Sequence, residues 1–138
     1  MADVVVTAKS VRPLLPSQTI IGIAGEAMSH GQVVVPNASN RWVLADASAA
    51  ATTVGLIGIV VAGGNEDGSV DSGDTITVLV FGRVCGFTGL NPTKLYYLSN
   101  TSGAISDTAG TVTRALGYAD PEGDGEVFFF MPAVAASS

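Results

Sequence analysis

The sequence predicts an all-β protein: a compact β-sandwich or barrel of about ten short strands, with an internal pseudo-repeat and an extended N-terminal arm. Three observations support this fold class. β-Branched and aromatic residues gather in short runs between clusters of Gly, Pro, Asn and Ser, and no segment has a long helical period. Turn signals recur at intervals of roughly ten residues, which is typical of sandwiches and barrels. One pattern of runs also occurs twice along the chain.

The repeated pattern has four runs in a fixed order. Each copy opens with two runs around a polar turn, continues with an apolar run that contains a glycine, and closes with a strongly apolar run. The first copy comprises residues 32–37, 41–46, 53–60 and 75–81, and the second comprises residues 94–100, 104–107, 111–119 and 126–131. This repetition predicts one β-domain built from two similar units.

Individual strands follow from the β-prone runs and the turn residues between them. Within residues 75–78, threonine alternates with aliphatic residues, as expected for a half-buried strand. The alanine-rich residues 47–53 are compatible with a short helix or with a flexible loop. The expected strands are residues 4–8, 19–24, 32–35, 41–45, 54–61, 75–81, 83–87, 94–98, 104–106, 112–119 and 126–131.

Three segments are expected: an N-terminal arm (1–16), a β-domain (17–131) and a flexible tail (132–138). Pro13 and Pro16 lack an amide hydrogen, so their segment is not expected to form a central strand. The run of valines at 4–6 is β-prone and has two interpretations. It is either an arm that adds a strand to a neighbouring chain, or an ordinary first strand of the same sheet.

The composition predicts a protein covered by partners. Charged residues make up 13% of the 138 residues, against about 25% in ordinary domains, and the net charge is −6. Such a surface is expected in an assembly, although an Ala-, Gly- and Ser-rich neutral surface is the alternative. The basic residues form no cluster, so neither nucleic acid nor an anionic membrane is an expected partner. The N-terminus does not resemble a signal peptide, so synthesis in a cytoplasm is expected.

No catalytic or metal-binding residue is expected. His30, the single histidine, has no partner nearby in sequence and is interpreted as a turn residue. The acidic residues 65–74 offer oxygen ligands for calcium, but their spacing does not match a known calcium loop and suits an exposed turn. Cys85 is the single cysteine, so no intramolecular disulfide forms. We therefore expect no cofactor and no enzymatic activity.

Consecutive aromatic residues mark two predicted strands. Because neighbouring side chains in a strand point to opposite faces, Tyr96 and Tyr97 cannot both lie in the core. The same alternation turns Phe129 away from Phe128 and Phe130. We expect Tyr97 and Phe129 at a subunit interface, where aromatic residues are enriched, with a covering loop as the alternative.

A combination of motifs spread over residues 24–131 resembles the small β-rich head proteins of tailed bacteriophages, the capsid decoration or cement proteins. Similar strings occur in modules of phage tail and fibre proteins. The matching segments are residues 24–27, 31–34, 42–47, 58–60, 73–78, 96–99 and 103–105.

The resemblance implies a structural virion protein, made in the host cytoplasm and placed on the outer capsid surface. Decoration proteins are typically homotrimers that clamp neighbouring major capsid proteins, and in several an N-terminal arm contacts the shell. By that resemblance, Val4, Val5, Val6 and Arg12 are expected to bind the major capsid protein. This chain is longer than the shortest decoration proteins and internally repeated. The alternative is a tail or fibre module that binds a host receptor or glycan through exposed Trp42 and Tyr97.

Overall fold

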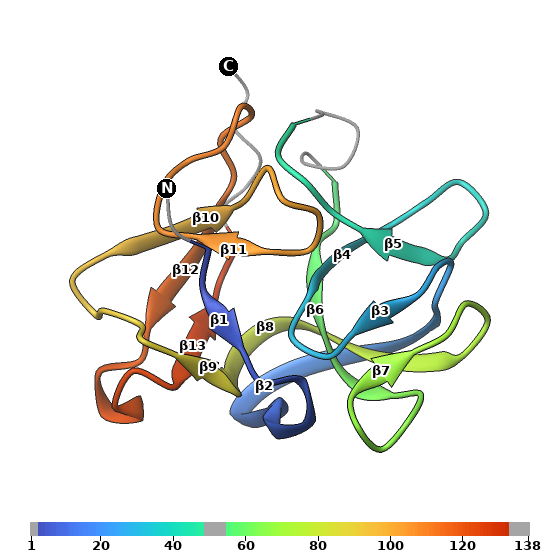
Figure 1. Cartoon of the computed structure of the whole chain (residues 1–138), viewed down its shortest axis with the longest axis horizontal. Coiled ribbons are helices and arrows are strands. Elements are labelled where there is room, and N and C mark those ends of the chain that lie inside the picture. The colour runs from blue at the N-terminus through green and yellow to red at the C-terminus, as the bar shows by residue number, and fades with distance from the viewer. Residues whose placement is uncertain (1–2, 49–54, 133–138) are drawn as a thin grey trace.

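The computed structural model describes residues 3–48 and 55–132 and is all-β, with 49% of residues in strands and 5% in helices. Most strands belong to a single nine-stranded sheet that curls into a half-barrel, which confirms the predicted fold class (Figure 1). Residues 49–53 of the alanine-rich segment expected as helix or loop (47–53) and residues 133–138 of the expected tail (132–138) lie outside the described residues. No helix among the described residues is long and apolar enough to cross a membrane.

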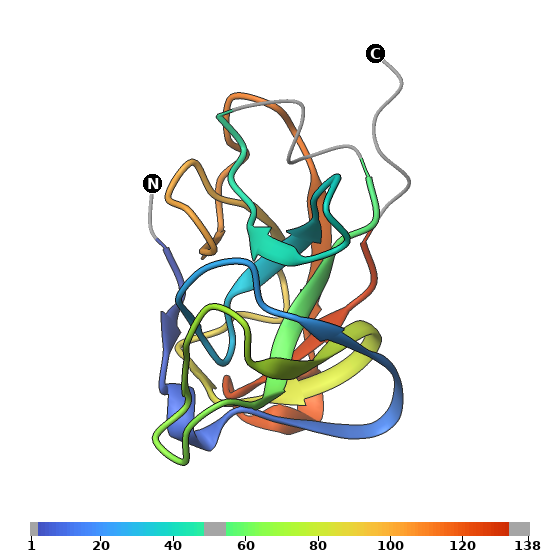
Figure 2. The ribbon, with the colours of Figure 1, turned by 90° about the vertical axis from the view of Figure 1, so that its right-hand side faces the viewer.

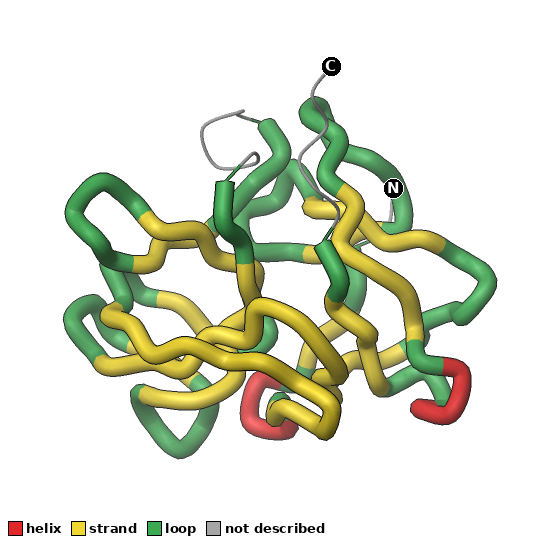
Figure 3. The backbone as a smooth tube through the Cα atoms, turned by 180° about the vertical axis from the view of Figure 1, so that it is seen from behind, coloured by secondary structure: helices red, strands yellow, loops and turns green. Residues whose placement is uncertain are grey.

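Thirteen strands and two short 3-10 helices follow one another along the described chain. The strands are β1 (Val5–Val6), β2 (Arg12–Ile23), β3 (Met28–Ser29), β4 (Val33–Pro36), β5 (Trp42–Leu44), β6 (Gly58–Gly63), β7 (Ser69–Val70), β8 (Thr75–Cys85), β9 (Phe87–Thr88), β10 (Leu95–Leu98), β11 (Ile105–Ser106), β12 (Ala115–Ala119) and β13 (Val127–Phe130). The 3-10 helices are η1 (Ala8–Ser10) and η3 (Pro121–Gly123). Figure 3 shows that strands dominate the fold and that loops connect them at the rim.

The sheet confirms the predicted repeat. Its strand order is β11-β10-β12-β13-β8-β6-β4-β5, and β2 pairs with β8 outside this path. The first unit (β5-β4-β6-β8) and the second unit (β11-β10-β12-β13) therefore have the same strand order, and every pair within them is antiparallel. The two units meet where β13 pairs with β8.

Strand β8 joins the two units. On one edge, its first part pairs with β6 and its last part pairs with β13, while β2 follows the other edge almost throughout. The sequence predicts two strands here, at 75–81 and 83–87, and this is wrong. Gly82 adopts a positive φ of 121° and lets one continuous strand bend, because a glycine tolerates that backbone conformation.

The N-terminal segment folds onto the same chain. Strand β1 pairs with β9, and Asp3 forms an isolated bridge with Ser106 of β11. Strand β2 begins at Arg12, so the expected boundary between residues 16 and 17 falls inside a strand. The prolines are accommodated because β2 lies at an edge and its register shifts between Leu14 and Ser17, around Pro16.

Two hydrophobic cores lie on opposite faces of the sheet. The main core fills the inside of the curl, between the two units, and the second core lies on the outer face of the first unit. Figure 2 shows β3 and the chain around it passing over the outside of the first unit. The second core consists of Ala24, Met28, Val34, Trp42, Val60, Val70, Ile76 and Val78.

Candidate interaction surfaces

Four aromatic side chains lie on the outer face of the second unit and the adjoining part of β8, and we call them the aromatic face: Tyr97, Tyr118, Phe129 and Phe81. Tyr118 and Phe129 are cross-strand neighbours in β12 and β13. The ring of Phe81, from β8, packs edge-on against Phe129 with 5.8 Å between centroids. Tyr118 and Phe81 keep 44% and 42% of their surface exposed, so large rings face solvent at the junction of the units.

The strand registers identify the equivalent residues in the first unit. One set of paired residues in each unit lies on the inner face: Val33, Ile59 and Leu79 in the first, and Tyr96, Gly117 and Phe130 in the second. The residues adjacent to these in sequence face outward. They are Val34, Val60 and Val78 in the first unit, and Tyr97, Tyr118 and Phe129 in the second.

The two equivalent surfaces differ in their cover. Val34, Val60 and Val78 are completely buried in the second core, together with Trp42 and Met28. No described segment covers the aromatic face in the same way, since Tyr118 stays exposed and Tyr97 and Phe129 are half-buried. The chain thus covers the outer face of the first unit with its own residues. The described residues leave the equivalent face of the second unit, which is more aromatic, open.

The alternation expected from the sequence is confirmed. Phe128 and Phe130 are fully buried on either side of half-buried Phe129, and Tyr96 is buried beside half-buried Tyr97. The role of Tyr97 and Phe129 in a subunit interface stays a prediction. Sequence reasoning missed Phe81 and Tyr118, although both lie in predicted strands, because their outward direction depends on cross-strand pairing.

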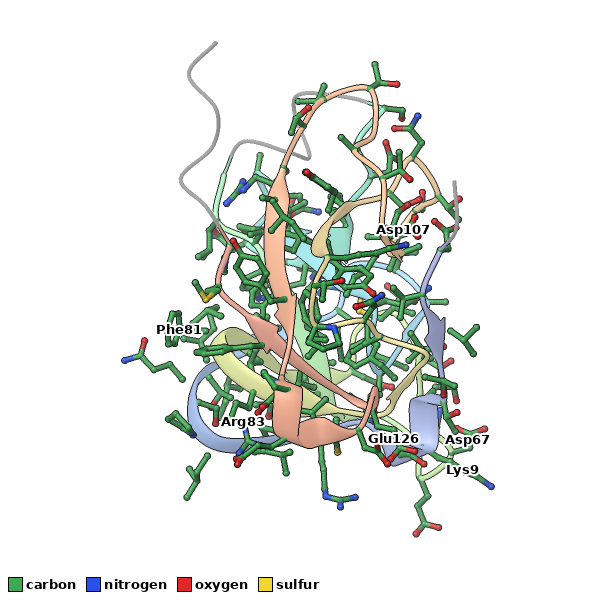
Figure 4. The ribbon with its side chains drawn as sticks, turned by 90° about the vertical axis from the view of Figure 1, so that its left-hand side faces the viewer. Lys9, Asp67, Phe81, Arg83, Asp107 and Glu126 are labelled. Atoms are coloured by element: carbon green, nitrogen blue, oxygen red, sulfur yellow. The ribbon has the colours of Figure 1, made fainter. Side chains whose placement is uncertain are left out.

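The charge beside the aromatic face is neutralised. Arg83, the cross-strand partner of Phe129, donates from Nε to Asp120 Oδ2 at 2.5 Å and from Nη1 to the Leu15 carbonyl oxygen at 2.9 Å. Asp120 also accepts from the backbone N–H of Glu122, and that bond, followed by Arg83, lowers the pKa of Asp120. Figure 4 shows Phe81 and Arg83 on one side of the molecule, with Asp107 and Glu126 on the other.

Because the pKa of Asp120 is lower in the folded state, its charge stabilises the fold above the unfolded pKa of about 3.9, and this contribution disappears as the pH falls through the folded value. We expect Asp120→Asn to lower the free energy of unfolding by about 1 kcal/mol at neutral pH. The difference from wild type should shrink as the pH falls through the lowered pKa of folded Asp120, because the protonated carboxyl carries no charge. Urea unfolding over a series of acidic pH values and at neutral pH measures it, and a difference that does not change with pH would contradict the ion-pair interpretation.

The residues expected to bind the capsid lie on the N-terminal surface. Val5 is 62% exposed and Arg12 is exposed, whereas Val4 and Val6 pack partly against the main core. The Val4 N–H donates to the Ile105 carbonyl at 2.7 Å, and β1 is paired with β9. Addition of β1 to a neighbouring chain would require these contacts to break. The capsid-binding role of the four residues stays a prediction, and in this arrangement the Val5 and Arg12 side chains are the accessible ones.

The polar loops have internal partners. His30 lies in a turn, as expected, with Nε2 2.7 Å from the Gly63 carbonyl oxygen. Asp67 accepts from the N–H and Oγ of Ser69 at 2.9 and 2.6 Å, and these bonds lower its pKa. Asp74 accepts from the Asp71 N–H at 2.9 Å. Within residues 3–48 and 55–132, no group of three or more His, Cys, Asp or Glu residues is arranged to hold a metal ion.

The expectation of an exposed Trp42 is wrong. Its side chain belongs to the second core, and only 5% of the residue is exposed. The indole lies over Gly22, where an added Cβ would come within 2.3 Å of Nε1. Trp42 is therefore unavailable as a stacking platform, and the glycan-binding alternative loses one of its two aromatic residues.

No protein-family model matches this chain, and a search of curated proteins finds no match to its sequence. We therefore infer a function from the sequence resemblance and from the aromatic face.

Proposed function

We propose that this chain is a non-enzymatic structural virion protein that binds the outside of a tailed-phage capsid, stabilises contacts between major capsid proteins and assembles as a homotrimer. The sequence resemblance supports the phage assignment. The single structural observation that supports an assembly role is the aromatic face, which the described residues leave open although its equivalent in the first unit is buried.

The aromatic face has the chemistry of a protein-binding surface. Tyr and Phe are enriched in the cores of protein interfaces, and exposed apolar patches of a few hundred Å² commonly mark such contacts. Met131, which is 40% exposed, follows β13 and enlarges the apolar area. Arg83 is already paired with Asp120, so a partner can cover this surface without leaving that charge uncompensated.

Co-sedimentation with empty expanded capsids tests the proposed function. The purified chain is expected to bind in a saturable manner, and the decorated shells are expected to resist heat better than bare shells. The proposal is wrong if the chain stays in the supernatant at every concentration.

Self-association is expected to depend on the aromatic face. Phe129→Ala or Tyr97→Ala should each weaken trimer formation about tenfold or more, since truncation of a central aromatic residue commonly costs 1–2 kcal/mol or more. Val5→Ala is the matched control, because Val5 is also an exposed apolar residue but lies on the N-terminal surface. Sedimentation velocity across a concentration series measures the effect. Equal masses for all three variants would remove the aromatic face from the interface.

A further inference from the structure

Each end of the nine-stranded sheet is partly covered by one isolated bridge, but the outer edge of β2 is open. At one end, Asp3 bridges Ser106 of β11, and at the other, Ala24 bridges Trp42 of β5. Strand β2 pairs with β8 along one edge, and no described residue pairs with its other edge before Ala24. Figure 2 shows β2 running along the outside of the molecule. Long open edges invite pairing with another strand, and proteins usually protect them.

The protection of β2 is confined to its first part. Pro13 and Pro16 lack amide hydrogens there, and the register with β8 shifts between Leu14 and Ser17 and again between Gln18 and Thr19. From residue 19 to residue 23 the pairing with β8 is regular. This segment contains neither proline nor a charged residue, so nothing in its sequence prevents a further strand from pairing.

The backbone groups that face the open edge follow from the antiparallel pairing. The Ala24 N–H donates to the Asp74 carbonyl at 2.9 Å, and the Ala24 carbonyl accepts from the Gly73 N–H at 2.8 Å. Ala24 is therefore a hydrogen-bonded position toward β8. Because hydrogen-bonded positions alternate along an antiparallel strand, the backbone N–H and C=O groups of Ile20 also point toward β8. Those of Thr19 and Ile21 point to the open edge.

The side chains along this edge are apolar and accessible. Ile21 is 76% exposed and Ile20 is 39% exposed, although the two point to opposite faces of the strand. Along the sequence, the nearest charged residues are Arg12 at the start of β2 and Glu26 beyond its end. A strand that fits here must be extended, uncharged and rich in β-branched residues.

We propose that the occupant is β2 of a second copy of this chain, paired antiparallel across a two-fold axis at Ile20. In that register Thr19 lies opposite Ile21 of the partner in both directions, and each such pair exchanges two backbone hydrogen bonds. The outward backbone groups of Thr19 and Ile21 can therefore all be paired by a second copy of the same edge. Each copy carries a net charge of −6, and this contact places no acidic residue opposite another. The contact uses the open edge of β2, which adjoins the aromatic face where Gln18 pairs with Phe81, and it does not depend on the proposed function.

Disulfide trapping tests this register. In a Cys85→Ser background, which removes the native thiol, Ile20→Cys places two cysteines opposite each other at a non-hydrogen-bonded pair, where Cβ atoms lie about 4.5–5.5 Å apart. Leu15→Cys is the matched control, because Leu15 is more exposed, at 82%, but lies before the regular segment. Under mild oxidation, most of the Ile20→Cys chains are expected to run as covalent dimers, with several-fold less dimer for Leu15→Cys.

Two further variants identify the contact. Ile21→Lys in the Ile20→Cys background should suppress cross-linking several-fold, because each lysine would lie opposite Thr19 of the partner and diagonally across the axis from the other lysine. Phe129→Ala in the same Ile20→Cys background should leave cross-linking unchanged. The inference is overturned if Leu15→Cys cross-links as readily as Ile20→Cys, or if Ile21→Lys has no effect. It is also overturned if no dimer is trapped while Ile21→Lys abolishes capsid binding, since the edge would then pair with a capsid strand.

Discussion

Alanine in place of Phe128 is expected to lower the free energy of unfolding by about 3–5 kcal/mol, the usual range for a buried aromatic residue. Phe128 is fully buried in the main core. Its ring centroid lies 5.8 Å from that of Phe87, 5.9 Å from Tyr96 and 6.4 Å from Phe130. Removal of the ring leaves a cavity among three aromatic residues that cannot collapse without moving β10 and β13. Urea unfolding followed by tyrosine and tryptophan fluorescence measures the loss.

Phe129→Ala is the matched control, because it removes the same ring one position along the same strand. Phe129 is half-buried on the outer face and packs against Phe81. The monomer should lose only about 1 kcal/mol, and the larger effect should be on self-association. Equal losses of folding stability for the two variants would show that the outer face is covered in the monomer, which would contradict the aromatic face as an open surface.

The repeat is the part of the fold that the sequence predicts best. Each run of the pattern corresponds to a strand, since alternation and turn residues act locally and do not depend on distant partners. The same alternation correctly separated Tyr96 from Tyr97 and Phe129 from its neighbours. Local patterns therefore predict which side of a strand each residue occupies.

Long-range pairing explains what the sequence did not predict. Residues 12–16 contain two prolines and do not resemble a strand in sequence, yet they extend β2 because residues 12–14 pair with the last part of β8. Trp42 appears in a polar context beside Arg41, but Gly22 leaves room for its ring some twenty positions earlier in the chain. Neither contact has a signal in the neighbouring residues.

Both sequence alternation and strand pairing were needed to identify the aromatic face. Sequence alternation identified Tyr97 and Phe129, whereas Tyr118 and Phe81 join them only through the registers of β12, β13 and β8. The difference between an open and a covered outer face depends on where residues 24–28 and 70 lie.

Deletion of residues 1–16 is expected to destabilise the fold by several kcal/mol and to leave little folded protein. Val11 is buried in the main core, and Val4 and Val6 pack against it. The deletion also removes β1 and the part of β2 that pairs with the end of β8. Circular dichroism and urea unfolding of the truncated chain measure this effect, and a truncated chain as stable as the full one would contradict it.

Loss of capsid binding on deletion would therefore not identify these residues as the capsid-binding surface. Val5→Asp combined with Arg12→Glu changes the two accessible side chains and leaves the backbone contacts of β1 in place. Folding stability should change by about 0.5 kcal/mol or less, as is usual for exposed positions. If this surface contacts the major capsid protein, occupancy on empty shells should fall about tenfold or more, because two unfavourable carboxylates are placed in the contact. Unchanged occupancy with intact folding would exclude the N-terminal surface and direct the search to the aromatic face.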